Sequence, residues 1–362
     1  MTTDTLGGVF SYATSLASWL SSQGVRVTLA SMGGPLSPEQ RAAVEQSRAR
    51  LEESSYRLEW MEDPWADVRR AGEWLLTLDR ELRPDMVHLN GYAHATLAWR
   101  APVCVVAHSC VCSWFRAVRG EAAPEGWGKY RELVARALAA AHVIAPTRAM
   151  LEMLRREYGR PRQGEVIWNG MLLPAAGDAP PKEPVVLAAG RVWDAAKNMA
   201  ALNAAAASVP WPICVAGEAL GPGAKESIAL PQLELLGVLA RDALALWMNR
   251  AAIFAAPALY EPFGLAILEA ATRGCALVLG DIPTLRELWS GSALFVDPRD
   301  PAALAAALNQ LIGDRALCAE LGRRAQRRAQ AYGLRRMGKA YLRAYRSSGT
   351  ARAASRLPEL SP

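Results

Sequence analysis

Two glutamates, Glu261 and Glu269, are separated by seven residues across a loop broken by proline and glycine. The apolar run 253–257 before this loop is typical of a buried strand, and apolar residues after Gly264 recur at helical spacing. Glu261 is therefore expected at the carboxyl end of a strand, and Glu269 on the second turn of a helix. Backbone N–H groups near Gly264 and Leu265 would point outward with the positive end of the helix dipole. The pattern predicts an anion site.

A second group of candidate ligand-binding residues follows the predicted strand 185–189. Gly190 and Arg191 come directly after it, and Lys197 lies six residues beyond Arg191, where a helix is expected to begin. Arginine binds phosphate oxygens through two hydrogen bonds and lysine adds a point charge, so the pair suits a diphosphate. Taken alone, the two residues are equally explained as surface cations. Their position at a strand end opposite the glutamates favours the diphosphate site.

Two weaker signals lie in the first half of the chain. Gly7 and Gly8 precede the first helix, where missing Cβ atoms let the backbone approach a ligand, although a glycine pair is more often a simple turn. His108 ends a predicted strand, where a histidine can equally hydrogen-bond the backbone. In parallel α/β sheets, ligands bind beyond the carboxyl ends of the strands. All four loop sets are therefore expected to converge on one cleft between two halves.

The elements that must position these residues alternate between short apolar strands and helices along the whole chain, which favours βα units and parallel sheets. In the first half we predict strands at 25–31, 56–60, 86–89, 103–107, 143–145 and 165–168, with helices at 10–22, 38–53, 65–82 and 126–141. In the second half we predict strands at 185–189, 212–216, 233–236, 252–256, 276–279 and 293–296, then helices near 301–312, 315–331 and 334–346.

At 362 residues the chain exceeds the length that one hydrophobic core usually supports. The polar, proline-broken stretch 171–184 reads as a linker between two similar-sized doubly wound α/β domains, 1–170 and 185–333. Residues 347–362 have the composition of a disordered tail.

The net charge of +6 is unevenly placed. Residues 314–346 hold ten Arg or Lys against two acids, a local +8, which leaves the remainder at 6 − 8 = −2. Four arginines of this segment fall on one helical face, which suits anionic lipid headgroups but is also typical of a solvated helix. Nucleic acid is disfavoured because no aromatic residues interleave with the basic cluster. These four are Arg323, Arg324, Arg327 and Arg328.

No apolar run is long enough to span a membrane, and the N-terminus lacks a signal-peptide pattern. Most of the six cysteines lie in apolar runs, which predicts buried, reduced thiols. Their spacing and the four histidines make a structural zinc site improbable, so we expect no metal. A cytoplasmic protein, peripheral at the inner face of the cell membrane if the basic helix binds lipid, is the expectation.

Taken together, these residues resemble the family-4 glycosyltransferases of the GT-B fold, over nearly the whole chain. The resemblance implies two Rossmann-like domains facing across a cleft. It implies transfer of a hexose from a nucleotide-diphosphate sugar to an acceptor with retention of configuration, without a metal ion or cofactor. The donor would be a co-substrate, in glycan or glycolipid synthesis. The motifs are Thr3–Val9, Val106–Ser109, Ala145–Thr147, Asn169–Gly170, Gly190–Asn198, Ala216–Glu218, Leu236–Gly237 and Glu261–Glu269.

The resemblance also implies roles for individual residues. Arg191 and Lys197 would hold the donor diphosphate and stabilise the charge that grows as the glycosidic bond breaks. Glu261 would bind hydroxyls of the donor sugar, Glu269 would bind the ribose, and His108 would lie near the reacting carbon. The backbone at Gly7, Gly8, Gly190, Phe263, Gly264 and Leu265 would complete the donor site.

By the same resemblance, the N-terminal domain would bind the acceptor, which could be a glycan, a lipid-linked sugar or a small molecule. The C-terminal domain would bind the donor, and helix 334–346 would cross back onto the first domain. Trp114, Arg116 and Arg119 are candidates for lining the acceptor site.

Two alternatives stay open. Another enzyme of this fold, a sugar-nucleotide epimerase or a phosphorylase, would share the donor site. An epimerase needs acid/base groups around the sugar, whereas a phosphorylase needs a lysine for pyridoxal phosphate. A non-catalytic nucleotide-sugar-binding protein would bind the donor without turnover.

One departure from the family concerns the first strand, which should precede Gly7 in the middle of the N-terminal sheet. Only residues 1–3 remain of it. A missing central strand would leave ladder groups of its two neighbours unpaired. We expect either that translation begins upstream or that this domain is compromised, and we favour the upstream start.

Overall fold

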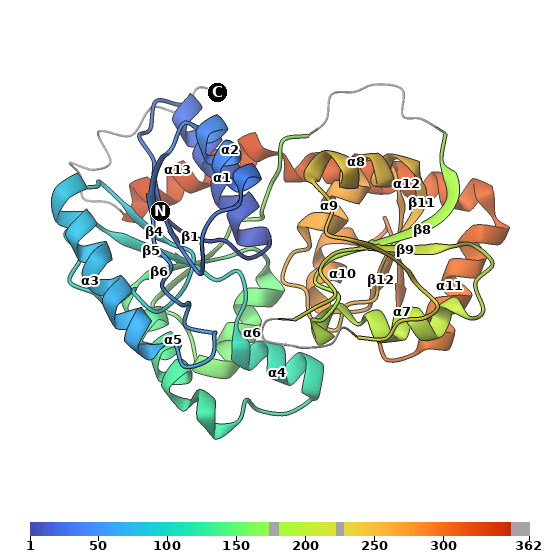
Figure 1. The fold of residues 1–362 in the computed structure, drawn as a ribbon, viewed down its shortest axis with the longest axis horizontal. Helices are drawn as coiled ribbons and strands as arrows, with labels where there is room; N and C mark the ends of the chain where they lie inside the picture. The colour runs from blue at the N-terminus through green and yellow to red at the C-terminus, as the bar shows by residue number, and fades with distance from the viewer. Residues whose placement is uncertain (174–180, 222–227, 349–362) are drawn as a thin grey trace. The chain divides into compact units, whose positions relative to one another are not determined.

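The computed structural model describes residues 1–173, 181–221 and 228–348. Part of the predicted linker, 174–180, and most of the predicted tail, 349–362, lie outside the described residues. The chain divides into two compact units (Figure 1). The first unit comprises Met1–Arg116, Glu121–Leu172 and Gly333–Pro362, and the second comprises Ala117–Gly120 and Leu173–Tyr332.

The second unit is built on a six-stranded, wholly parallel sheet of order β10-β9-β8-β11-β12-β13. Its strands are β8 (Glu183–Ala189), β9 (Ile213–Ala216), β10 (Glu234–Gly237), β11 (Ala251–Ala256), β12 (Ala276–Gly280) and β13 (Leu294–Val296). This is the doubly wound order in which the chain direction across the sheet reverses between β8 and β11. The predicted strands of this half are confirmed.

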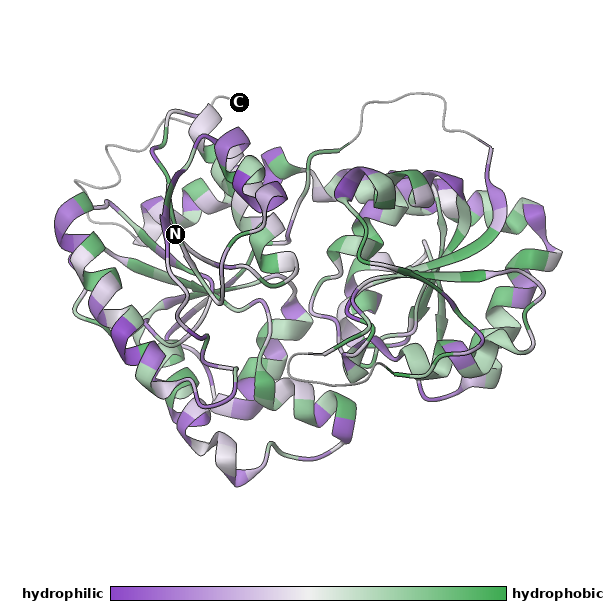
Figure 2. Ribbon diagram, viewed as in Figure 1, coloured by the Kyte–Doolittle hydropathy of each residue, from purple (hydrophilic) through white to green (hydrophobic). Residues whose placement is uncertain are grey.

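Helices cover both faces of this sheet. α8 and α12 lie with α9 on one face, and α7 packs with α11 on the other (Figure 1). The central strands β9, β8, β11 and β12 are mainly apolar because helices bury both of their faces, whereas the edge strand β10 is largely exposed (Figure 2). The helices are α7 (Met199–Ala206), α8 (Arg241–Arg250), α9 (Leu265–Thr272), α10 (Pro283–Trp289), α11 (Pro301–Gly313) and α12 (Arg315–Ala329), with the 3-10 turns η2 (Ala195–Lys197) and η3 (Gln330–Tyr332).

The first unit has seven parallel strands in two hydrogen-bonded groups, β3-β2-β1 and β4-β5-β6-β7. The strands are β1 (Thr2–Asp4), β2 (Thr28–Met32), β3 (Arg50–Glu53), β4 (Val87–Leu89), β5 (Val103–Val106), β6 (His142–Ala145) and β7 (Gln163–Val166). If β1 is placed beside β4, the order β3-β2-β1-β4-β5-β6-β7 follows the same pattern as the sheet of the second unit, with one further strand at the end. The α/β fold class predicted from the sequence is confirmed in both units.

The join between the two groups is made by side chains. Asn90, just after β4, donates from its backbone N–H to Thr2 Oγ1 at 2.9 Å and from its amide to the Thr2 carbonyl at 2.7 Å. No ladder pair joins β1 to β4 within the residues that the structure describes. The predicted short first strand is thus present as β1, which pairs with β2 only.

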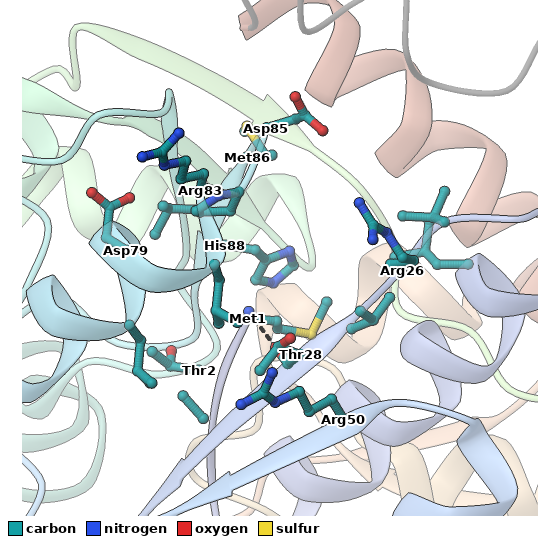
Figure 3. Close-up of a pocket in the computed structure, with 18 of the residues that line it drawn as sticks. Met1, Thr2, Arg26, Thr28, Arg50, Asp79, Arg83, Asp85, Met86 and His88 are labelled. Atoms are coloured by element: carbon teal, nitrogen blue, oxygen red, sulfur yellow. Dashed lines mark hydrogen bonds between the residues drawn. The ribbon is translucent and has the colours of Figure 1, made fainter.

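A cavity of about 850 Å³ lies at the amino ends of β1, β2 and β4 (Figure 3). Met1 lies in it, with the terminal ammonium donating to the Thr28 carbonyl at 2.8 Å. Apolar side chains such as Leu20 and Leu75 line the cavity, and several arginines, including Arg26 and Arg50, also border it. It occupies the path that β1 would follow if it were extended toward its amino end.

The helices that the structure describes wholly or mainly in the first unit are α1 (Gly8–Ser22), α2 (Pro38–Ser47), α3 (Trp65–Leu82), α4 (Val111–Arg119), α5 (Gly128–Ala140), α6 (Arg148–Tyr158) and α13 (Leu334–Ser348), with the 3-10 turn η1 (Glu125–Trp127). α13 packs on α1 so closely that a Cβ added at Gly338 would lie 2.1 Å from the ring of Trp19. Its side chains Met337, Tyr341 and Tyr345 are buried.

The prediction of a helix over 38–53 and a strand over 56–60 is wrong. A capping box between Ser37 and Gln40 does start the helix, but Arg48 adopts a left-handed conformation with φ 57° and ends it. The chain then forms β3 beside β2. Residues 56–60 form a loop in which Leu58 is buried against other apolar side chains, so the alternation of Tyr56, Leu58 and Trp60 with charged residues reflects packing of a loop rather than a strand.

No helix in the described ranges is long and apolar enough to cross a membrane. All six cysteines fall within those ranges and are buried thiols, as the sequence predicted.

Candidate functional site

The centre of the candidate site is an ion pair between Lys197 and Glu261. The Lys197 ammonium lies 2.5 Å from Glu261 Oε2, and the two side chains are 21% and 16% exposed. Lys197 ends η2 after β8, and Glu261 lies in the loop between β11 and α9. β8 and β11 are neighbours at the point where the sheet order reverses, which is where ligands bind in doubly wound sheets.

Arg191 is fixed beside this pair by Asp194. Its guanidinium donates to Asp194 Oδ2 at 2.7 Å, and it lies over the ring of Trp193 at 5.2 Å. Asp194 is almost fully buried, and its second oxygen accepts from Ala196 N–H at the start of η2. One carboxylate therefore holds the loop shape and orients a guanidinium that is still 43% exposed.

The loop before α9 needs glycine at position 264. Gly264 has φ 85°, and a Cβ there would lie 2.7 Å from the Ile267 side chain. The first N–H groups of α9, from Leu265 onward, have no partner within the helix because helix geometry leaves the first turn unsatisfied. Phe263 is buried with its ring against Tyr332, so only its backbone is available to a ligand.

Glu269 lies on α9 and is largely shielded from solvent. Burial raises the pKa of its carboxyl group, and the nearby charges of Arg241 and Arg273 partly oppose that rise. Among the described residues, none donates a hydrogen bond to this carboxylate. A shielded carboxylate with free acceptor capacity suits a ligand that brings hydroxyl donors.

Two glycines shape the adjoining loops. Gly190 has φ 152° and packs on the Lys197 side chain, where a Cβ would lie 3.5 Å from Cδ. Gly217, after β9, has φ 148°, and its Cβ would lie 1.8 Å from the Gly190 carbonyl oxygen. The sequence analysis quoted the Ala216–Glu218 motif without giving Gly217 a role. This close approach explains why position 217 holds glycine.

In the first unit, His108 is held by Asn90. The two residues follow β5 and β4, and His108 Nε2 lies 2.9 Å from Asn90 Oδ1. Asn90 Nδ2 donates to Thr2, which fixes the amide orientation and leaves Oδ1 as an acceptor. His108 therefore carries its hydrogen on Nε2, and its Nδ1 keeps a lone pair. Burial lowers the pKa of His108 to about 3, so the ring is neutral.

Asn90 was missed by the sequence analysis, and it holds a second ring as well. His88 Nε2 lies 3.0 Å from the same Oδ1, and His88 Nδ1 accepts from the hydroxyl of Tyr345 on α13 at 2.6 Å. Burial lowers the pKa of His88 to about 3. The only sequence feature that could have indicated this role was the position of an asparagine directly after a predicted strand.

Of the glycine pair, only Gly7 needs to be glycine. It precedes α1 with φ 87° and has open space around it, so its backbone can approach a ligand. Gly8 is the first residue of α1 and is exposed.

The three candidate acceptor residues lie on α4, a helix that the sequence analysis did not predict. Trp114 stacks edge-on against Phe115 with ring centroids 5.2 Å apart. Arg116 forms an ion pair with the buried carboxylate of Glu157, so its charge is already paired. Arg119 is exposed at the end of the helix.

The structure thus gathers Gly190, Arg191, Lys197, Glu261, Phe263, Gly264, Leu265 and Glu269 on loops that share the carboxyl edge of the second sheet or on the helix that follows them. Gly7 and His108 follow strands of the first unit. Cations beside helix N-termini can neutralise charge that develops on a leaving diphosphate. The roles of these residues, and their meeting in one cleft, stay predictions.

Two family models match this chain. "Glycosyltransferase Family 4" matches residues 6–171, and "Glycosyl transferases group 1" matches residues 183–314. Together they cover most of the chain and follow its two units. The chain therefore belongs to the family-4 glycosyltransferases, with the GT-B fold.

Similar proteins point the same way. A probable sucrose-phosphate synthase 5 of Oryza sativa subsp. japonica is 44% identical over 75 residues, which are 20% of this chain and 7% of that protein. The chain thus matches only a small part of the curated relatives' length. A solved sucrose-phosphate synthase from Thermosynechococcus elongatus is similar with a TM-score of 0.78 at 21% identity, covering 94% of this chain and 93% of the other. Anabaena HepE in complex with UDP has a TM-score of 0.73 at 18% identity, covering 96% and 99%.

Proposed function

We propose that this protein is a retaining hexosyltransferase that transfers a sugar from a nucleotide-diphosphate donor to an acceptor in glycan or glycolipid synthesis. The observation that carries the proposal is the Lys197–Glu261 pair, 2.5 Å apart at the reversal point of the second sheet, with Arg191 beside it. Two cations and a helix N-terminus suit a diphosphate, and a carboxylate suits sugar hydroxyls.

In the proposed reaction, Lys197 leaves Glu261 for the donor phosphates when the donor binds. Lys197 and Arg191 then neutralise the charge that grows on the diphosphate as the bond to the sugar breaks. Glu261, released from its ion pair, accepts hydrogen bonds from hydroxyls of the sugar. Glu261 does not form a covalent bond to the sugar in this scheme. The acceptor attacks the face from which the diphosphate leaves, with a phosphate oxygen as base.

His108 would contribute as a neutral ring. Its Nδ1 lone pair can accept a hydrogen bond from a sugar hydroxyl, and the low pKa of the buried ring keeps it uncharged beside an electron-poor carbon. A charged ring there would oppose an oxocarbenium-like transition state. Glu269 would accept hydrogen bonds from the ribose hydroxyls. Independence from metal ions is part of the proposal.

UDP-glucose is the first donor to test, because HepE was solved with UDP and with UDP-glucose. The experiment incubates the protein with a panel of nucleotide sugars and follows release of the nucleoside diphosphate, with and without EDTA. Release from one donor above the rate without protein supports the proposal. Tight donor binding with no release on any acceptor panel would instead favour a non-catalytic binding protein. Conversion of the donor to its epimer would favour an epimerase.

We also propose that α12 contacts an anionic membrane surface, which would place the enzyme beside a lipid-linked acceptor. Arg323, Arg324 and Arg327 are exposed and all pair with Glu320, so this cluster keeps a net positive charge. Arg328 differs, because its guanidinium donates to the Leu288 carbonyl at 2.7 Å. Three exposed arginines around one glutamate suit phosphate headgroups.

A further inference from the structure

Asn198 links the loop that carries Lys197 to two other loops. Its amide nitrogen donates to the carbonyl of Pro257, after β11, at 2.9 Å, and to the carbonyl of Pro298, after β13, at 2.5 Å. Its backbone is left-handed with φ 59°, a conformation that asparagine tolerates better than most residues. Asn198 thus supplies both the turn that directs Lys197 and two hydrogen bonds that fix the turn.

Thr284 acts in the same way on Glu261. It lies on α10, just after β12, and is completely buried. Its hydroxyl donates to the backbone carbonyl of Glu261 at 2.6 Å. The backbone from which the Glu261 carboxylate extends is therefore fixed by a buried side chain of the next βα loop.

Both links converge on the Lys197–Glu261 pair. Leu259 N–H also donates to the Ala196 carbonyl at 2.9 Å, which ties the β11 loop directly to η2. Two buried or half-buried polar side chains therefore connect the loops after β8, β11, β12 and β13 at one edge of the sheet.

We propose that Asn198 and Thr284 are positioning residues, with Asn198 placing Lys197 for the donor diphosphate and Thr284 placing Glu261 for the donor sugar. This inference rests on the proposed function. Its physical basis is that lysine has four rotatable bonds and glutamate three, so their charged ends are only as well placed as the backbone that carries them. A displacement of about 1 Å in a reacting geometry can cost about 100-fold in rate.

Asn198 is predicted to affect binding of the donor diphosphate, and Thr284 is predicted to affect binding of the donor sugar. This difference distinguishes a positioning role from a general effect on stability. The experiment measures the dissociation constants of UDP and UDP-glucose by calorimetry, the kcat and KM of donor turnover, and the melting temperature. The variants are Asn198→Gly, which keeps the left-handed turn but removes both donors, and Thr284→Val, which removes only the hydroxyl. Thr284→Ser restores the hydroxyl. Asn309→Ala is the matched control, because the Asn309 amide donates to the carbonyl of Ser208, which follows the end of α7 opposite to Asn198.

Asn198→Gly is expected to weaken UDP binding about 10-fold, because Lys197 is misplaced for the phosphates. Thr284→Val is expected to leave UDP binding within about 2-fold, but to weaken UDP-glucose relative to UDP and to lower kcat/KM by about 10- to 100-fold. Thr284→Ser should recover most of this loss, and Asn309→Ala should change none of the ligand constants.

Equal losses for UDP and UDP-glucose in both variants, in proportion to their melting temperatures, would overturn the inference in favour of a purely structural role. Unchanged ligand constants in both variants would overturn it as well. If the unmodified protein binds UDP and UDP-glucose but turns over neither, the proposed transferase activity fails. The binding measurements still decide the positioning roles in that case.

Discussion

Asn90 Oδ1 accepts a hydrogen bond from His108 Nε2 at 2.9 Å, and this contact sets which nitrogen of the histidine is free. The same oxygen lies 3.0 Å from His88 Nε2. One amide thus joins β1, β4 and β5 and contacts two rings that burial keeps neutral. A carboxylate in its place would hold the rings in the same orientation but favour their charged forms.

Replacing Asn90 with aspartate is therefore expected to raise the pKa of both histidines well above the present value of about 3. The measurement is an NMR titration of the histidine ring protons. His94 serves as an internal reference, because its ring nitrogen contacts the Val68 carbonyl instead. An unchanged His108 titration in this variant would mean that Asn90 does not control the ring.

Stability of the unmodified protein is expected to fall as the pH falls below about 6.5. Burial lowers the pKa of His88 and His108 from 6.5 to about 3, so the unfolded state binds more protons than the folded state between these values. Within this window, each of these two histidines lowers the free energy of unfolding by about 1.4 kcal/mol for every unit by which the pH falls. Urea unfolding at several pH values measures the slope. His108→Gln should remove the His108 contribution alone, and a slope identical to that of the unmodified protein would count against the assignment.

Lys197→Ala and Glu261→Ala are each expected to lower donor turnover by about 100-fold or more, because each removes a group that acts on the charge or hydroxyls of the donor. The fold should persist, since both side chains reach solvent. Circular dichroism and donor hydrolysis provide the two readouts. Arg250→Ala is the control, because Arg250 forms a well-aligned ion pair with Glu183 on the surface of the same unit. Full activity in either site variant would contradict the site.

Extending β1 at its amino end is expected to stabilise the first unit. The cavity of about 850 Å³ is lined by Met1 and by residues at the amino ends of β2 and β4, and Met1 already hydrogen-bonds β2 through its ammonium and its carbonyl. Added residues with apolar side chains would gain ladder bonds and bury apolar area worth about 25 cal/mol per Å². Thermal unfolding of an extended variant measures the effect. A Gly-Ser extension of equal length should give little gain, and equal gains would argue against strand formation in the cavity.

Arg323→Glu combined with Arg327→Glu is expected to weaken sedimentation with vesicles of anionic phospholipid, because it reverses two exposed charges on α12. Neutral phosphatidylcholine vesicles serve as the control surface. Arg250→Glu, on α8 of the same unit, provides a charge-reversed comparison away from this cluster. Binding that is indifferent to the α12 charges would identify this face as a solvated helix surface.

Local sequence patterns predicted the second unit closely. Its central strands are buried on both faces and are mainly apolar, and Asp300 and Asp314 cap α11 and α12 as local sequence dictates. The first unit was predicted less well. Tyr56, Leu58 and Trp60 alternate with charged residues but pack from a loop, and the end of α2 depends on one left-handed residue, Arg48.

The sequence by itself determined the α/β class, the strands of the second unit, the glycines that permit the loops at positions 7 and 264, and the residue types at the strand ends, because all of these depend on neighbours along the chain. The tertiary structure alone decided that Lys197 meets Glu261 and that Asn90 holds His108. These pairs come from separate βα loops that only the sheet order brings together. The spacing of these residues along the chain does not determine which strands become neighbours in the sheet.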